Sequence, residues 1–251
     1  MNLKDKFDEN FLLTNETGKY LYEKYAKDMP IIDYHCHLPV KALYENKEFE
    51  DLGELWLSGD HYKWRAMRTF GIDEKYITGD ASYHEKFLAY AKIMPELIGN
   101  PLYIWSALEL KRYFGIEEPL CEENAEQIYQ QTKEIIQKNH ITPRYCLEVS
   151  NVEVASTTED PTDSLEYHQK LKEDTSLKFK VISAFRPDKA FYCEREGFPA
   201  YIAALEKVSG IKINSFEMLF IALEKRLLEI ETVINVLNDD LLNSLSIEIK
   251  R

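Results

Sequence analysis

Apolar and polar residues alternate along this chain with two different periods, which separate strand-like from helix-like segments. Residues 31–38 are a short run rich in apolar and aromatic residues that ends before Pro39, which is typical of a buried strand in a parallel sheet. Two later runs, 152–158 and 179–185, have the same character, and a helical pattern at 163–172 lies between them. Strands that alternate with helices predict βαβ units and an α/β fold.

Helices are marked by apolar residues at every third or fourth position. They are predicted over residues 16–27, 49–57, 61–70, 83–94, 101–114, 125–137, 163–172 and 198–209. Asp163 and Glu166 have the spacing of a capping box at the start of one of them. Between residues 41 and 139 almost all signals are helical, which predicts a large helical block after the first strand. A stripe of apolar residues from Phe216 to Leu241 predicts a long C-terminal amphipathic helix over 215–245.

Composition limits the classes of partner and location. The 251 residues suit one large domain or two small ones, and 31 Lys and Arg against 44 Asp and Glu give a net charge of −13. Such a chain repels nucleic acid and anionic lipid. The longest apolar run, 218–223, is too short to span a membrane, and residues 1–10 are too charged for a signal peptide. We therefore expect a cytoplasmic protein with no nucleic-acid or membrane partner. Its cysteines are expected to be thiols: Cys36, Cys121, Cys146 and Cys193.

The clearest candidate for chemistry is the pair His35 and His37 at the end of the first predicted strand. Side chains alternate across a strand, so both imidazoles can bind one cation while Cys36 points to the other face. Two imidazole nitrogens suit zinc, with manganese or iron as alternatives, and a site needs at least one more protein ligand. Asp33 shares their face, either to orient them or as a solvated carboxylate. Two histidines that are merely hydrogen-bonded at a strand end remain the structural alternative.

A second candidate group follows a Ser-Gly-Asp turn. His61 and Tyr62 lie near the start of a predicted helix, from where they can reach a substrate, and Arg65 adds positive charge one turn later. The structural alternative is an ordinary amphipathic helix start with Trp64 in the core.

A third candidate lies where the third predicted strand ends. Pro187 holds Arg186 extended, and an arginine at the carboxyl end of a parallel strand is well placed to bind a carboxylate through two hydrogen bonds. An ion pair with Asp188 is the structural alternative. The polar residues 157–161 end the second strand and serve either substrate contact or loop and helix capping. Solvated or capping roles are expected for the three remaining histidines, His84, His140 and His168.

Five motifs occur in an order that resembles bacterial uronate isomerases, also called glucuronate isomerases. They are IDYHCH at 32–37, GDHYKWR at 59–65, GNPLY at 99–103, TTEDP at 157–161 and FRPDK at 185–189. The resemblance runs from about residue 7 to residue 226. It implies an amidohydrolase-like (β/α)₈ TIM barrel with a helical insertion after its first strand. The expected parts are an arm with the first strand (1–40), the helical insertion (41–145), further β/α units (146–226) and a divergent helical tail (227–251).

The same resemblance implies an activity. Members of the family interconvert D-glucuronate with D-fructuronate, and D-galacturonate with D-tagaturonate, by moving a proton through an enediol. By resemblance, one divalent metal, zinc in the first place, is held by His35 and His37. The resemblance assigns His61 and Tyr62 as catalytic groups and Arg186 as a residue that binds the hexuronate sugar acid. Arg65, whose charge lies one turn after His61 and Tyr62, is the second residue expected to bind it.

The chain also departs from the family. Family members are nearly twice as long, and their second half supplies the aspartate that completes the metal site. A truncated, partial barrel with an open sheet edge is therefore expected. The apolar stripe 216–241 is expected to pack either over this edge or against the same stripe of a second copy in a homo-oligomer. The alternative function is a non-catalytic binding or assembly module built on a degenerate half-barrel.

Overall fold

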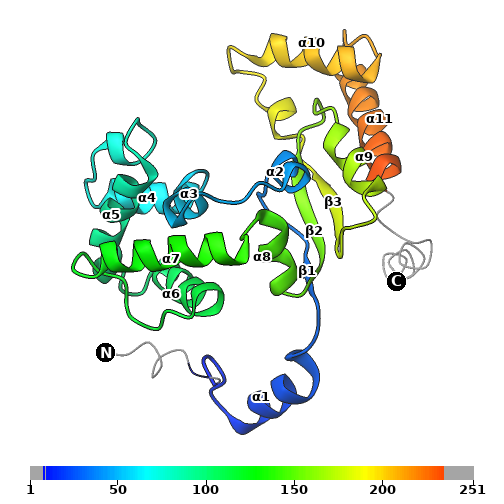
Figure 1. Cartoon of the computed structure of the whole chain (residues 1–251). Helices are drawn as coiled ribbons and strands as arrows, with labels where there is room; N and C mark the ends of the chain where they lie inside the picture. The colour runs from blue at the N-terminus through cyan, green and yellow to red at the C-terminus, as the bar shows by residue number, and fades with distance from the viewer. Residues whose placement is uncertain (1–7, 9, 235–251) are drawn as a thin grey trace. The chain divides into compact units, whose positions relative to one another are not determined.

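The computed structural model describes residue 8 and residues 10–234 of the chain (Figure 1). Its strands are β1 (Ile31–Asp33), β2 (Val152–Glu159) and β3 (Lys180–Phe185). Its α-helices are α1 (Glu16–Leu21), α2 (Val40–Glu45), α3 (Leu52–Leu57), α4 (His61–Thr69), α5 (Tyr83–Ile93), α6 (Pro101–Phe114), α7 (Ala125–Asn139), α8 (Pro143–Val149), α9 (Glu166–Glu173), α10 (Phe198–Ser209) and α11 (Phe216–Ile234). A π-helical turn, η2 (Tyr22–Ala26), and three 3₁₀ turns, η3 (Glu74–Tyr76), η4 (Met94–Glu96) and η5 (Asp188–Phe191), complete the set. Among the described helices, none combines the length and apolar character that a membrane span requires.

The strands form one parallel sheet in the order β1-β2-β3, which confirms the α/β class. β2 pairs with β3 from Val154 opposite Lys180 to Glu159 opposite Phe185. β1 is shorter than the strand predicted over 31–38. A register shift interrupts its ladder between its first two residues. Beyond the strand the chain bends, and it returns to β2 through the Cys36 amide, which donates to the Ser156 carbonyl at 2.8 Å.

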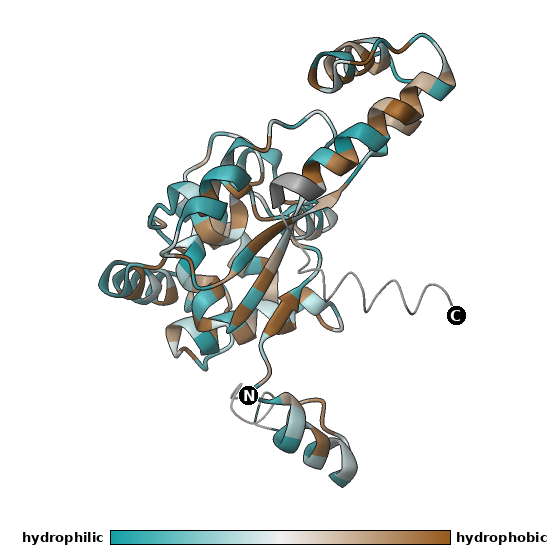
Figure 2. Cartoon of the chain, turned by 90° about the vertical axis from the view of Figure 1, so that its right-hand side faces the viewer, coloured by the Kyte–Doolittle hydropathy of each residue, from teal (hydrophilic) through white to brown (hydrophobic). Residues whose placement is uncertain are grey.

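The strands carry hydrophobic segments, brown in Figure 2, as do the helices. In the described part of the chain, β1 and β3 are the edge strands of the sheet. β1 leaves large apolar side chains accessible, and Ile32 is 63% exposed. Because β1 and β3 each pair with one strand within the described residues, the sheet has open edges there, as expected from the sequence.

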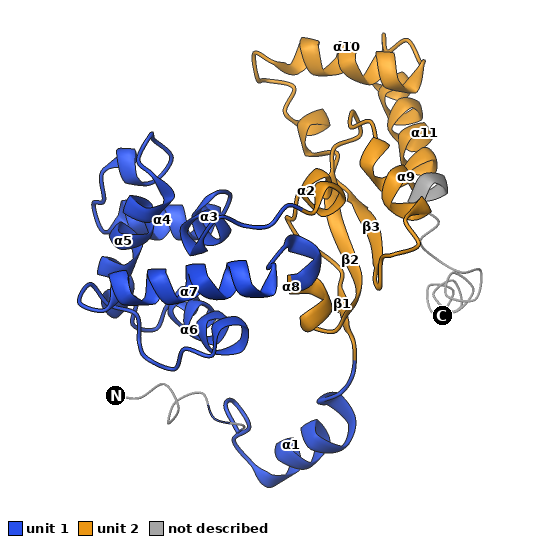
Figure 3. Ribbon diagram, viewed as in Figure 1, with its two compact units in different colours: residues 1–29, 47–145 blue, residues 30–46, 146–251 orange. Residues whose placement is uncertain are grey.

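The chain divides into two compact units, one of residues 1–29 and 47–145 and one of residues 30–46 and 146–251 (Figure 3). Unit 1 contains α3 to α7, which correspond to the helical block expected from the sequence. Its core includes Trp56, whose ring centroid lies 6.1 Å from that of Phe87 and 5.9 Å from that of Tyr90. The four-part division by residue number remains a prediction.

Unit 2 contains the sheet with α2, α9, α10 and α11. One face of α11 is buried inside this unit: Leu219 and Leu223 pack with Leu205 of α10. Ile230 packs with Leu165 and with residues of β3. The predicted C-terminal helix is thus confirmed over α11, and its predicted continuation to residue 245 lies outside the described residues. Residues of α11 thus contact β3, whereas packing over the open sheet edge and the homo-oligomer both remain predictions.

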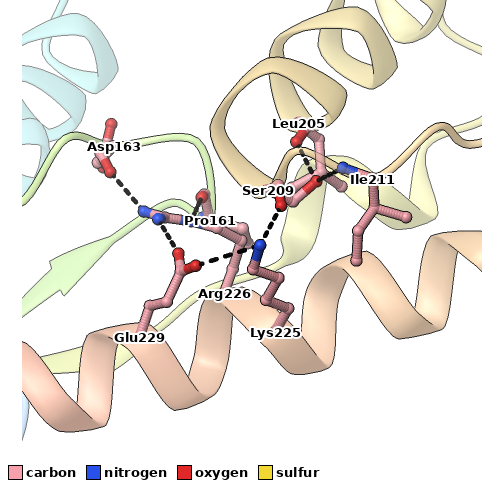
Figure 4. A network of polar contacts seen from close by, with 8 residues as sticks. All are labelled: Pro161, Asp163, Leu205, Ser209, Ile211, Lys225, Arg226 and Glu229. Carbon is pink, nitrogen blue, oxygen red and sulfur yellow. Dashed lines mark hydrogen bonds and ion pairs between the residues drawn. The ribbon is translucent and has the colours of Figure 1, made fainter.

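Polar contacts tie α11 to two further segments of unit 2 (Figure 4). The buried Arg226 donates from Nε to the Pro161 carbonyl and from Nη2 to the Asp163 carbonyl, both at 2.8 Å, and also pairs with Glu229. Lys225 donates from Nζ to the carbonyl of Ser209, the last residue of α10, at 2.6 Å. One helix therefore holds both the loop after β2 and the end of α10.

The start of α9 differs from the sequence prediction. The helix begins at Glu166, and Leu165, with a φ of 58°, occupies the cap position without a side-chain hydrogen bond. Asp163 instead accepts a hydrogen bond from the Asp160 amide at 2.8 Å. The predicted capping box is wrong because the Asp163 carboxylate closes the preceding turn.

The four cysteines form no disulfide, and all of them lie in the described part of the chain. Cys193 is exposed and the other three are partly buried.

Candidate functional site

His35 and His37 face each other just beyond the end of β1. Their Nε2 atoms lie 2.9 Å apart, and their ring planes are inclined at 68° with the centroids 5.0 Å apart. Both side chains are accessible to solvent. Cys36, between them, packs against the hydrophobic core under the sheet. The alternation expected for a strand therefore persists here, although the strand itself ends at Asp33.

The separation of the two nitrogens fits a shared cation. Histidine nitrogens lie about 2.0–2.1 Å from a bound zinc, so two ligands are about 3.3–3.4 Å apart at the tetrahedral angle and about 2.9 Å apart at right angles. Two neutral imidazoles at this distance are otherwise compatible only if one donates the hydrogen bond and the other accepts it. The donor set and its spacing thus fit a divalent metal and also the structural alternative of a His–His hydrogen bond.

The described residues supply these two nitrogens without a complete ligand set. Within residue 8 and residues 10–234, no group of three or more His, Cys, Asp or Glu side chains is placed to hold a metal ion. Asp33 accepts a hydrogen bond from the His35 amide at 3.3 Å, so it fixes the turn that presents the first imidazole. Burial raises the pKa of the Cys36 thiol, which favours the protonated form of that side chain.

His61, Tyr62 and Arg65 lie together on the first turns of α4 in unit 1, and all three are exposed. The His61 ring meets the Trp64 ring edge-on, with the centroids 4.9 Å apart, and the Trp64 indole N–H donates to the Leu57 carbonyl at 2.8 Å. The Arg65 guanidinium lies 5.7 Å from the centroid of the Tyr62 ring. The helix therefore presents an imidazole, a phenol and a cation to solvent from one short segment.

Two residues of the same motif received no role from the sequence. Asp60 caps α4: its Oδ1 accepts hydrogen bonds from the Tyr62 and Lys63 amides, and its Oδ2 accepts one from Lys63 Nζ at 2.7 Å. Lys63, and not Trp64, is the buried residue of this turn, at 4% exposure. The preference for Asp at a helix N-cap after a Ser-Gly turn was the available signal for the first of them.

Arg186 follows β3 in unit 2 and is exposed. Its backbone amide donates to the Glu159 carbonyl at 2.9 Å, which fixes it beside the end of β2. Its Nε donates to Asp188 Oδ2 at 3.0 Å, so the ion pair considered as the structural alternative is present. An exposed pair of this kind is weak and leaves the side chain able to exchange its partner for a ligand carboxylate.

A buried polar cluster joins β2 to α9. Thr157 Oγ1 lies 2.9 Å from Glu159 Oε2 and 2.9 Å from His168 Nε2. His168 is 3% exposed, so the solvated or capping role expected for it is wrong: the helix turns this side chain toward the sheet. Burial lowers the pKa of His168 to about 4 and raises the pKa of Glu159. The His168 imidazole is therefore neutral near pH 7, so its 3.5 Å contact with Glu159 is not a pair of opposite charges.

Comparison with known proteins decides the family. A family model described as glucuronate isomerase matches residues 3–247. The chain belongs to the glucuronate isomerase family. Curated members that it resembles are the uronate isomerases of Caldanaerobacter subterraneus, 54% identical over 220 residues, and of Bacillus subtilis, 54% identical over 218 residues. These alignments cover 88% and 87% of this chain but 47% and 46% of the relatives. The chain thus spans about half the length of the curated glucuronate isomerase relatives that it matches.

Solved structures agree with this family. A uronate isomerase from Thermotoga maritima has a TM-score of 0.83 and 36% identity, with 90% of this chain and 49% of that chain covered. A glucuronate isomerase from Caulobacter crescentus has a TM-score of 0.82 and 26% identity, with 93% and 50% covered. The sheet and helices described above are therefore those of glucuronate isomerase structures, as the motif order predicts.

Proposed function

We propose that this chain carries the metal-binding and hexuronate-binding residues of a uronate isomerase. The reaction is the interconversion of D-glucuronate with D-fructuronate, and of D-galacturonate with D-tagaturonate. The converging His35 and His37 nitrogens, in a chain of this family, are the observation that supports the proposal. The match of motifs and fold does not favour a non-catalytic assembly module.

The proposed scaffold is the amidohydrolase-like (β/α)₈ barrel, of which β1, β2 and β3 would be the first strands. Three features of the structure support it: the strands are parallel, they are adjacent in chain order, and a helical block follows the first of them. Polar residues at the carboxyl ends of such strands are where barrel enzymes carry their active sites. His35, His37 and Arg186 all follow strand ends in this way.

In the proposed reaction, a proton leaves the carbon next to the aldehyde, an enediol forms, and a proton returns to the neighbouring carbon. His61 and Tyr62 are the proposed proton-transfer groups, because both are exposed on one helix turn. Arg186, with Arg65, would bind the carboxylate of the sugar acid. His35 and His37 would hold a divalent metal, zinc in the first place, which stabilises negative charge that develops on oxygen.

The metal site is tested by calorimetric titration. Wild type and the His35→Ala/His37→Ala variant are compared with Mn²⁺ as well as Zn²⁺, because thiols compete for zinc more than for manganese. His140→Ala is the matched control, since His140 is 79% exposed and pairs with Glu48 in unit 1. We expect one metal site that the double variant loses and the control keeps. Equal binding by all three proteins would overturn the metal assignment.

The activity is tested on the purified chain loaded with metal. We expect conversion of D-glucuronate or D-galacturonate that requires the metal and disappears in the His35→Ala/His37→Ala variant. Arg186→Met should raise KM for the hexuronates, because it removes the two hydrogen bonds that the guanidinium is proposed to donate to the substrate carboxylate. If the metal-loaded chain converts neither hexuronate, isomerisation by this chain is refuted, whatever the titration shows.

A further inference from the structure

The first turn of α4 contains an ion pair between a buried lysine and a partly buried aspartate, directly beside two exposed polar aromatic residues. Lys63 Nζ lies 2.7 Å from Asp60 Oδ2, and the Lys63 side chain is 6% exposed. The ammonium also lies 5.5 Å from the centroid of the Trp56 ring, which is itself buried. His61 and Tyr62, between the two charged residues in sequence, are exposed. The same turn therefore has a fixed inner side and an accessible outer side.

This ion pair makes the start of the helix energetically unfavourable. A lysine in the first turn faces the positive end of the helix dipole, and burial removes water from its ammonium. A short polar cap without a buried lysine would stabilise the helix start at lower cost. Proteins retain such locally unfavourable features mainly where function requires them.

The Asp60 carboxylate connects this pair to the backbone of the exposed residues. Its Oδ1 accepts hydrogen bonds from the amides of Tyr62, at 2.8 Å, and Lys63, at 3.1 Å. These amides lie in the first turn, where the helix offers them no carbonyl acceptor of its own. Since Lys63 holds the other oxygen, the ammonium fixes the carboxylate that in turn fixes the backbone of the turn.

The surroundings of Asp60 favour its charged form. Burial is the largest influence on the pKa of Asp60 and would raise it, but the Lys63 ammonium and the amide hydrogen bonds hold the pKa below its usual value. Glu109 of α6 is a second carboxylate that interacts with Lys63. Burial raises the pKa of Glu109 and outweighs the opposite effect of this lysine. Asp60, whose Oδ2 lies 2.7 Å from Lys63 Nζ, contacts the ammonium directly.

We propose that Asp60 and Lys63 are positioning residues that hold His61 and Tyr62 in the orientation needed for proton transfer. The inference rests on the proposed function, since it assigns these two residues a task in that reaction. Asp60 and Lys63 do not touch the substrate. They act through the backbone of the first turn of α4, and their ion pair prevents that turn from fraying.

The first test is amide hydrogen exchange measured by NMR on the whole chain. Lys63→Met keeps the length of the side chain and removes its charge. Lys86→Met is the matched control, because Lys86 is also buried in unit 1, at 8% exposure, and its ammonium lies 5.4 Å from the Tyr83 ring. We expect exchange at positions 62 and 63 to accelerate at least about tenfold in Lys63→Met, which is a change of about 1.4 kcal/mol. The amide of the buried Leu110 should be unaffected.

Two outcomes of the hydrogen-exchange measurement contradict the inference. If exchange accelerates equally at Leu110 and at the first turn of α4, or does not change at all, the inference is overturned. If Lys63→Met does not fold, Asp60→Ser carries the same test, because serine retains a cap acceptor while it loses the partner of Lys63.

The second test separates kcat from KM in the metal-loaded chain. Misplaced proton-transfer groups lower kcat, so we expect a loss of about 10- to 100-fold in Lys63→Met with KM changed less than about twofold. Lys86→Met should keep both constants. A rise in KM with an unchanged kcat would contradict the inference. If wild type converts no hexuronate, the proposed function fails, and the exchange result alone decides whether the pair positions the turn.

Discussion

Arg226 of α11 provides a quantitative test of how unit 2 is held together. Arg226→Met removes the guanidinium but keeps most of the aliphatic stem that packs against the helix. Two backbone carbonyls, those of Pro161 and Asp163, lose their 2.8 Å donors (Figure 4). The carboxylate of Glu229 also loses a partner, but it is 37% exposed and water replaces the contact.

The expected cost follows from these contacts. A hydrogen bond to a charged group contributes about 1.5–3 kcal/mol, so two such bonds give about 3–6 kcal/mol. The Asp163 carbonyl is only partly buried and regains some hydration, so we expect the lower end, about 3 kcal/mol. Lys225→Met is the control. Lys225 is 47% exposed and donates to a single carbonyl, that of Ser209, so its loss should cost about 1 kcal/mol or less.

Urea unfolding followed by two probes measures this difference. The three tryptophans, Trp56, Trp64 and Trp105, all lie in unit 1, so their fluorescence reports that unit, whereas far-UV circular dichroism reports both. Arg226→Met should lower the midpoint of the dichroism transition by about 1–2 M and leave the fluorescence transition in place. A dichroism midpoint equal to that of the Lys225→Met control, or a shift seen in fluorescence instead, would refute this account of α11.

Three further predictions concern other parts of the chain. Burial lowers the pKa of His168 to about 4, so between pH 6.5 and 4 the unfolded state binds more protons than the folded state. The free energy of unfolding should therefore fall by up to about 3 kcal/mol as the pH decreases through this range. His168→Gln should remove this slope and the exposed His140→Gln should keep it, as pH-dependent urea titrations will show; the same slope in both variants would contradict the assignment. Gly53→Ala should destabilise the chain by more than about 3 kcal/mol in thermal melts, because the new Cβ would lie 2.2 Å from a backbone carbonyl oxygen. Gly59→Ala is the control: open space surrounds this position, so the change should be neutral within about 0.5 kcal/mol. Equal melting temperatures for the two variants would contradict the packing described around Gly53. Light scattering tests the homo-oligomer: Phe220→Asp, at a residue that is 52% exposed on α11, should give a monomer if the helix mediates association, and an unchanged mass would exclude that interface.

Element bounds were predictable where the chain carries strong local signals. α6 and α10 begin and end at the predicted residues. In α6, Asn100 caps the start, and Gly115 follows its end with a φ of 66°. Gly210 ends α10 with the same φ. Glycine adopts this left-handed conformation without steric cost, so a glycine at the end of a helical pattern is a strong signal for the helix end.

Features that depend on tertiary hydrogen bonds were not predictable. The Asp163 carboxylate accepts its hydrogen bond from the Asp160 amide and does not cap α9, and no local sequence pattern predicts which of the two bonds forms. Likewise, nothing in the sequence around His168 shows that α9 turns it toward Thr157.

In the candidate site, too, features with a local sequence signal were predictable and features that depend on tertiary packing were not. The spacing of His35 and His37 sufficed to predict that their nitrogens converge, because alternation is a property of extended backbone. The burial of Lys63 was missed because it depends on Trp56 and on the packing of unit 1. A charged residue in an amphipathic helix is ordinarily assigned to the solvent face, and only the assembled core reverses that assignment.

The uneven accessibility of the cysteines has a practical consequence. Cys193 is exposed, whereas the other three are partly buried, and burial raises the pKa of the Cys36 thiol. Thiolate is the form that reacts with maleimides, so a limiting amount of fluorophore should attach to Cys193 first. That residue lies between η5 and α10, in the segment that follows Arg186. The sequence therefore already contains a labelling position from which changes near the end of β3 can be followed spectroscopically.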